Sequence, residues 1–183
     1  MTFDLRFHPC NGRLTAVMKS FALWFLLAFG VSAAPQGVWK TYTPRAELEP
    51  SWSKEGDVLT IFPNGRKGAV GQWQATFPVK GGQHYRFSAI RKTWDIDIQN
   101  VQRHIVERLI WLDADGNKVK RDEPTFSSYR PGTAPRAEPE FPRVTGAMTR
   151  GGWMEVLEVF KAPKAATQVK VELCLRWLDA GRV

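Results

Sequence analysis

The chain has 183 residues, of which 43% are hydrophobic and 24% charged, and its formal net charge is +8. This composition is typical of one folded globular domain. Basic and acidic residues alternate without a block of five or six like charges, which argues against a nucleic-acid-binding protein.

The first 33 residues are predicted to be a helical signal peptide that is cleaved. Residues 21–29 form an uninterrupted apolar run between Lys19 and the small-x-small cleavage pattern Val31-Ser32-Ala33. The run is too short to cross a bilayer comfortably, and Met18 is an alternative start for the same signal. Cleavage would leave residues 34–183 as a secreted or periplasmic module without a membrane anchor.

The two cysteines do not predict a disulfide. Cys10 leaves with the signal peptide, and an exported chain with one remaining cysteine has no internal partner for it. Cys174 lies between two leucines in an apolar strand, so we interpret it as a structural thiol rather than a nucleophile.

The first half of residues 34–183 is predicted to consist of strands and turns. A strand at 39–42, a proline-bounded connector at 44–50 and a strand at 57–62 lead to two runs that alternate with a period of two. Inward positions of these runs are Trp73, Ala75 and Phe77, then Tyr85, Phe87 and Ala89. Gly81 and Gly82 supply the backbone angles of the turn between them. The runs either form an antiparallel pair or carry the chain between two sheets.

The second half continues this pattern around a long irregular stretch. A strand at 104–113 is apolar on both faces, and a turn leads to a return strand at 118–120. Residues 120–152 contain five prolines and are predicted to be a functional loop. Strands follow at 153–160 and 168–177, the latter with Val169, Val171, Leu173, Leu175 and Trp177 facing the core. No helix is predicted after the signal peptide, so the fold class is all-β, a jelly-roll-like antiparallel β-sandwich.

The order of these predicted strands and turns resembles that of galactose-binding-like sandwiches, the fold of many carbohydrate-binding modules. The resemblance rests on Gly81-Gly82-x-x-Tyr85-x-Phe87, on Ile110-Trp111-Leu112-Asp113-x-x-Gly116 and on Gly152-Trp153. More narrowly, Pro44 to Glu47 and the loop from Tyr129 to Pro142 resemble the N-terminal sandwich of exported bacterial nitrilase-type carbon–nitrogen hydrolases.

The hydrolase resemblance has two departures. That family's catalytic Glu, Lys and Cys belong to a large α/β domain that this sequence lacks, and Cys174 matches no nucleophile motif. The family's sandwich also continues with a further strand, so residues 34–183 are expected to lack their last strand. The resemblance therefore implies no catalytic activity for this chain alone.

Two groups of oxygen-bearing side chains are candidates for chemistry. Asp113, Asp115 and Asn117 have the spacing of a calcium-loop start, but the twelfth position is Pro124 instead of Glu, so a hairpin turn is favoured. Four glutamates offer acid and base groups for a glycosidase, and their spacing selects no pair: Glu47, Glu107, Glu138 and Glu140. We expect neither a catalytic site nor a cofactor.

Aromatic residues at the junctions of loops and strands are the predicted ligand contacts. Aromatic rings bind the apolar face of a sugar while charged neighbours take its hydroxyl groups. The predicted ligand-binding residues are Trp94, Tyr129, Arg143 and Trp153. Trp111 and Trp177 alternate with apolar residues and are predicted to be buried. The expected function is a non-catalytic carbohydrate-binding module; the alternative is a structural domain that docks on a carbon–nitrogen hydrolase.

Overall fold

The computed structural model describes residues 8–9, 37–65, 67–94, 101–123, 136–148 and 151–178. The predicted signal peptide lies outside these ranges except for two residues, and so do Tyr129 and the last five residues, where a missing strand was predicted. The described elements are β1 (His8–Pro9), β2 (Lys40–Tyr42), the 3-10 turn η1 (Ala46–Leu48), β3 (Ser51–Glu55), β4 (Val58–Phe62), β5 (Ala69–Pro78), β6 (His84–Arg91), α1 (Val101–His104), β7 (Ile105–Leu112), β8 (Val144–Met148), β9 (Met154–Lys161) and β10 (Gln168–Leu178).

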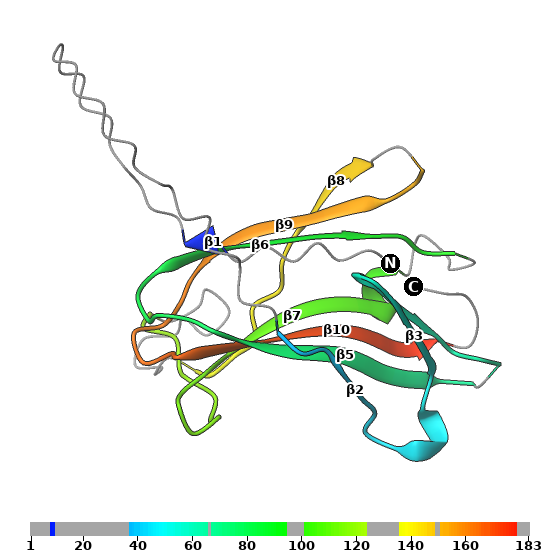
Figure 1. Ribbon diagram of the computed structural model, residues 1–183, viewed down its shortest axis with the longest axis horizontal. Coiled ribbons are helices and arrows are strands. Elements are labelled where there is room, and N and C mark those ends of the chain that lie inside the picture. Colours follow the sequence, from blue (N-terminus) through cyan, green and yellow to red (C-terminus); the bar gives the residue numbers. More distant parts are fainter. Residues whose placement is uncertain are drawn as a thin grey trace, which may run out of the picture.

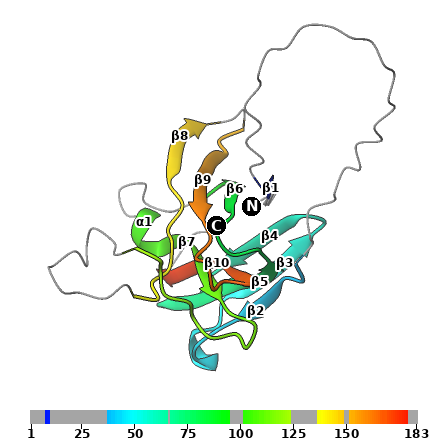
Figure 2. The same ribbon diagram turned by 90° about the vertical axis from the view of Figure 1, so that its left-hand side faces the viewer.

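Two four-stranded antiparallel sheets face each other across one core (Figures 1 and 2). One sheet has the order β1-β6-β9-β8, the other β2-β5-β10-β7, and β3 and β4 form a separate hairpin. The core cluster takes Phe87 and Val156 from the first sheet and Phe77 and Val171 from the second. The predicted all-β class and the predicted sandwich are therefore confirmed.

Two neighbouring connections carry the chain from one sheet to the other. β5 pairs with β10 in one sheet, and β6 pairs with β9 in the other. The β5–β6 link and the β9–β10 link therefore run next to each other as they pass between the sheets. Backbone hydrogen bonds join the two links: Gly82 N donates to Ala162 O at 2.9 Å, and Val79 N donates to Thr167 O at 2.8 Å. The Gly81-Gly82 turn thus connects two sheets, which was the second of the two predicted alternatives.

The two glycines of this turn are needed for different reasons. Gly82 has φ +79° and open space where a Cβ would stand, so it supplies the predicted left-handed conformation. Gly81 has no positive φ; a Cβ there would lie 2.1 Å from the carbonyl oxygen of Lys164. The close approach of the two crossing links requires Gly81, a reason that the sequence did not reveal.

The last strand confirms its predicted alternation as far as Leu175 and departs from it at Trp177. Val169, Val171, Leu173 and Leu175 are buried. The register then shifts between Leu175 and Leu178, Trp177 takes φ +51°, and its side chain is 64% exposed. The prediction that Trp177 is buried is wrong because this bulge turns its ring outward and places Leu178 in the buried position.

Other differences concern short elements. The predicted loop at 120–152 contains β8, the connector at 44–50 is followed by β3, and α1 precedes β7 where no helix was predicted. The predicted return strand at 118–120 is reduced to a single bridge between Leu112 and Lys118. Within the described ranges, neither helical element has the length or apolar character to span a bilayer.

We predict that Gly81→Ala destabilises the protein more than Gly82→Ala does. The new methyl group at position 81 meets backbone that cannot move without separating the two links, which should lower the free energy of unfolding by about 3 kcal/mol. The methyl group at position 82 meets no atom, so only backbone strain of about 1 kcal/mol is expected. Urea unfolding of both variants measures the difference, and equal losses would contradict the steric explanation.

Candidate binding pocket

A pocket of about 430 Å³ opens on the side of the sandwich where β7 and β8 are the edge strands. Residues 136–143 cross this side: Glu140 exchanges backbone hydrogen bonds of 2.9 and 2.8 Å with Leu109 of β7, and β8 begins at Val144. The pocket is lined by Arg91, Ile105, Val106, Glu107 and residues 141–144. Its volume is within the range of about 300–1,000 Å³ that ligand pockets occupy.

A buried ion pair joins the two sheets in this pocket. Arg91 is the last residue of β6 and follows the inward series of Phe87 and Ala89, while Glu107 faces inward from β7. The Nη1 atom of Arg91 donates to both carboxylate oxygens of Glu107, at 2.9 and 3.0 Å. The side chains are only 3% and 5% exposed, and the Nε atom of Arg91 has no hydrogen-bond acceptor.

The rim of the pocket carries an aromatic ring and a second arginine. Phe141 is 54% exposed, and the side chain of Arg143 is 85% exposed. Glu158 of β9 accepts a 2.9 Å hydrogen bond from the backbone N–H of Arg143, and its other oxygen lies 3.5 Å from Nε of the same residue. The pocket thus combines charged groups at its floor and rim with the apolar side chains of Ile105 and Val144.

A further arginine, Arg121, pairs with Glu140 of the segment 136–143. Arg121 Nη2 donates to Glu140 Oε2 at 2.7 Å. Burial raises the pKa of the Glu140 carboxyl group above its usual range, although the charge of Arg121 opposes this shift. Of the four candidate catalytic glutamates, Glu107 and Glu140 are therefore each bound by an arginine, and Glu47 of η1 lies 3.9 Å from Arg45.

The structure brings together two of the predicted ligand contacts. Trp94 and Trp153 pack edge to face, with ring centroids 6.4 Å apart, and Nζ of Lys92 lies 5.3 Å from the centroid of Trp94. Trp153 directly precedes Met154, the β9 partner of Arg91, so this aromatic pair lies at the strand ends that lead to the pocket. Arg143 lies at the pocket rim instead, and Tyr129 is outside the described residues. Sequence reasoning missed Arg91 and Phe141.

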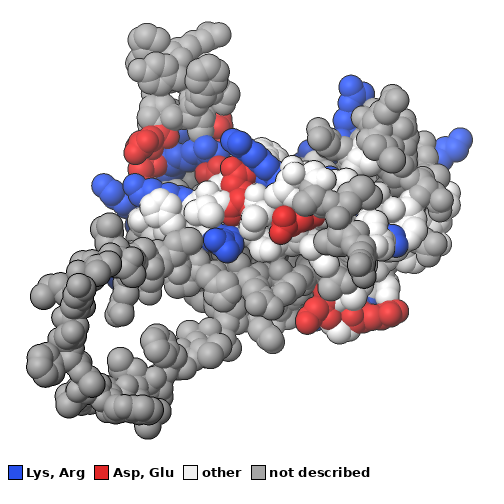
Figure 3. Space-filling model, turned by 90° about the horizontal axis from the view of Figure 1, so that it is seen from above, with Lys and Arg blue, Asp and Glu red and all other residues white. Residues whose placement is uncertain are grey.

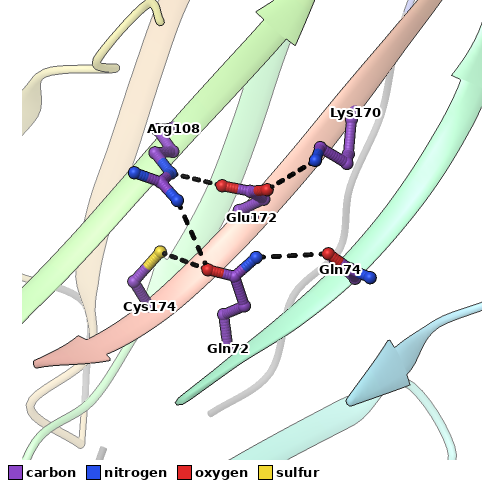
Figure 4. A network of polar contacts seen from close by, with 6 residues as sticks. All are labelled: Gln72, Gln74, Arg108, Lys170, Glu172 and Cys174. Atoms are coloured by element: carbon purple, nitrogen blue, oxygen red, sulfur yellow. Dashed lines mark hydrogen bonds and ion pairs between the residues drawn. The ribbon is translucent and has the colours of Figure 1, made fainter. Parts of the chain in front are cut away.

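A polar network covers part of the outer face of the β2-β5-β10-β7 sheet (Figure 4). The carboxylate of Glu172 is bound by Arg108 and by Lys170, the latter at 2.9 Å. Gln72 accepts from Arg108 at 3.4 Å and from the Cys174 thiol at 3.5 Å. Burial raises the pKa of the Cys174 thiol to about 11, so the thiol stays protonated at neutral pH, as expected of a structural cysteine.

The weighed calcium-loop residues form a hydrogen-bonded turn. The carboxylate of Asp113 accepts from the backbone N–H groups of Asp115 and Asn117, at 3.0 and 2.8 Å, and from the amide of Asn117 at 3.3 Å. The backbone hydrogen bond from Asn117 contributes most to lowering the pKa of Asp113. Across the described ranges, no three His, Cys, Asp or Glu side chains gather in a metal-binding arrangement.

Opposite charges lie side by side on the face seen from above the β1-β6-β9-β8 sheet (Figure 3). Lys and Arg side chains alternate there with Asp and Glu side chains, and the described part of this face shows no broad area of one sign. On the described part of this face, the charges therefore do not form a stripe such as would follow a phosphate backbone.

Comparisons with known proteins establish no family. No family model matches the chain, and no curated protein matches it. Among solved structures, the enzymatically active domain of bacteriophage CBA120 tailspike protein 4 aligns with 80% of this chain and 18% of its own, at 11% identity and a TM-score of 0.46. The CBM22-1–GH10 modules of Clostridium thermocellum endo-1,4-beta-D-xylanase 10B, complexed with xylohexaose, align with 79% of this chain and 24% of their own, at 12% identity and a TM-score of 0.37. The chain thus spans less than a quarter of either, and the hydrolase resemblance stays a prediction from the sequence.

We predict strong coupling between Arg91 and Glu107. Replacing one partner, as in Glu107→Leu or Arg91→Met, leaves an uncompensated buried charge and should lower the free energy of unfolding by about 3–5 kcal/mol. The double variant removes both charges and should lose much less, because apolar groups of similar volume replace the pair. Denaturant unfolding of the four proteins gives the coupling energy. Single and double losses that simply add would contradict the prediction.

We predict that Glu172 stabilises the fold in a pH-dependent way. Burial alone would raise the pKa of Glu172, but hydrogen bonds from Lys170 and Arg108 outweigh burial and lower the pKa below its ordinary value of 4.5. A lowered folded-state pKa contributes stability that is complete above the unfolded value and is lost as pH falls through the folded value. The stability difference between wild type and Glu172→Gln should therefore be largest near neutral pH and shrink below about pH 4.5. The exposed Glu55→Gln is the control, and a difference for Glu172→Gln that is constant with pH would contradict the prediction.

Proposed function

We propose that this chain is a non-catalytic carbohydrate-binding module, a jelly-roll-like sandwich that holds a sugar in the pocket between β7 and β8. The observation that carries the proposal is the Arg91–Glu107 pair, which offers hydrogen-bond donors and an acceptor side by side within an apolar pocket. Neighbouring hydroxyl groups of a sugar ring each donate and accept, so one can accept from arginine while the next donates to glutamate. Few converging polar groups in a mainly apolar wall are typical of ligand pockets.

Aromatic side chains support a sugar in preference to other polar ligands. The half-exposed ring of Phe141 at the rim offers a flat apolar face to one side of a pyranose ring. Trp94 and Trp153 remain candidate contacts for the next ring of a longer ligand, because they lie at the strand ends that lead to the pocket. Arg143 is positioned for the polar edge of the ligand at the rim.

The absence of catalysis is part of the same proposal. Glycoside hydrolysis needs one carboxyl group that holds a proton and one that stays ionised. The described lining of the pocket contains one carboxyl group, that of Glu107, and both of its oxygens accept from Arg91. Export through the predicted signal peptide and docking on a hydrolase domain are separate predictions from the sequence, and this proposal requires neither.

We predict that Phe141→Ala weakens saccharide binding without destabilising the protein. A glycan array identifies the bound saccharide, and isothermal titration calorimetry then measures its affinity for each variant. Loss of the stacking surface should reduce affinity about tenfold, and the melting temperature should change little because about half of the ring is already exposed.

The matched control is Val159→Ala, which removes an exposed apolar side chain from β9, outside the pocket lining. Its affinity should equal that of the wild type. Binding of no saccharide on the array, or equal affinities for Phe141→Ala and wild type, would contradict the proposed function.

A further inference from the structure

The charged groups that line the pocket do not balance. Arg91 and Arg143 contribute two positive charges and Glu107 one negative charge, so the lining carries 2 − 1 = +1. Arg91 and Glu107 neutralise each other at the floor. The remaining positive charge of the lining lies at the rim, on Arg143, whose Nε atom is 3.5 Å from a carboxylate oxygen of Glu158, a residue outside the lining.

Arg143 presents its charged group outward from the rim. Glu158, its neighbour on β9, accepts a short hydrogen bond from the backbone of Arg143, whereas the guanidinium group approaches Glu158 only to 3.5 Å through Nε. The side chain is 85% exposed, so most of its N–H donors remain accessible. A guanidinium group with accessible donors matches a carboxylate, which it can bind through two parallel hydrogen bonds.

The floor arginine has a donor that no protein group accepts. The Nε atom of Arg91 is buried and lacks an acceptor, although Nη1 of the same side chain makes two hydrogen bonds to Glu107. A buried donor without an acceptor is costly, and an oxygen atom of a water or a bound molecule would relieve that cost. A ligand with a hydroxyl group at the floor and a negative group at the rim would match both arginines.

We propose that the pocket is selective for a uronic acid residue of an oligosaccharide, an inference that rests on the proposed carbohydrate-binding function. A uronic acid carries hydroxyl groups along one edge of its ring and a carboxylate on the opposite edge. The hydroxyl edge binds Arg91 and Glu107, the carboxylate binds Arg143, and the ring face packs on Phe141. A neutral hexose of the same stereochemistry lacks the group that Arg143 recognises.

The test compares acidic oligosaccharides with their neutral counterparts. Oligogalacturonate, oligoglucuronate and oligomannuronate are each titrated into the protein by calorimetry, beside the same oligosaccharide with its carboxyl groups reduced to alcohols. At about 0.15 M salt, where long-range attraction is screened, we expect at least one acidic form to bind about tenfold tighter than its reduced form. Equal affinities of the acidic and reduced forms would overturn the selectivity while leaving the carbohydrate-binding function intact. Failure of every saccharide, acidic or neutral, to bind would overturn both.

Variants assign the preference to one side chain. Arg143→Gln should abolish the preference for the acidic form, so that the ratio of the acidic to the reduced affinity falls to about one, and Arg143→Lys should keep part of the preference because the charge remains. Arg45→Gln, an equally large charge change at an exposed arginine outside the pocket, is the matched control. A preference that survives Arg143→Gln, or that falls equally with Arg45→Gln, would show general attraction to a basic protein and overturn the proposal.

Discussion

The buried pair of opposite charges at Arg91 and Glu107 constrains how the two sheets pack on the side where β7 and β8 are the edge strands, which we call the open side. Each charge would be costly in an apolar interior unless it meets its partner. The partners come from different sheets, Arg91 from the end of β6 and Glu107 from β7. The sheets can therefore neither slide nor close further at this point without breaking two hydrogen bonds. The pair thus holds the sheets at the separation that leaves room for the pocket.

The topology explains why the pocket lies on this side. The paired strands β5 and β10, and β6 and β9, form one long ribbon that folds across both sheets. β7 and β8 then add to the same side of that ribbon, one in each sheet, and each leaves an edge. Among the residues that the structure describes, 136–143 cross between these two edges, held to β7 by the backbone pair of Leu109 and Glu140. This segment covers less of the core than a paired strand would.

The periodicity of apolar residues predicts most of the strands, and it fails where another constraint decides. The series through Val169, Val171 and Leu173 identifies β10 because a half-buried strand needs that period. It wrongly predicts that Trp177 is buried. A bulge shifts the register of β10 at this point, and the spacing of apolar residues does not predict a bulge. Hydropathy also does not predict the charged residues at the floor of the pocket. Arg91 and Glu107 stand at inward positions of two strands, and two opposite charges at such positions are the available signal for a buried pair.

Within the described structure, the buried polar groups of the outer face and those of the pocket side differ in how many of their donors and acceptors are hydrogen-bonded. We use this difference to distinguish groups that stabilise the fold from groups that could bind a ligand. On the outer face, both oxygens of Glu172 have cationic partners and both ends of the Gln72 amide are bonded. On the pocket side, Arg91 keeps a buried Nε without an acceptor, and so does Arg121, which lies outside the pocket lining. Buried polar groups are almost always paired, and exceptions call for an explanation. A fully bonded network needs no ligand, whereas the Nε atom of Arg91 is a donor that a ligand oxygen would satisfy. This contrast supports the proposal that a ligand binds in the pocket between β7 and β8.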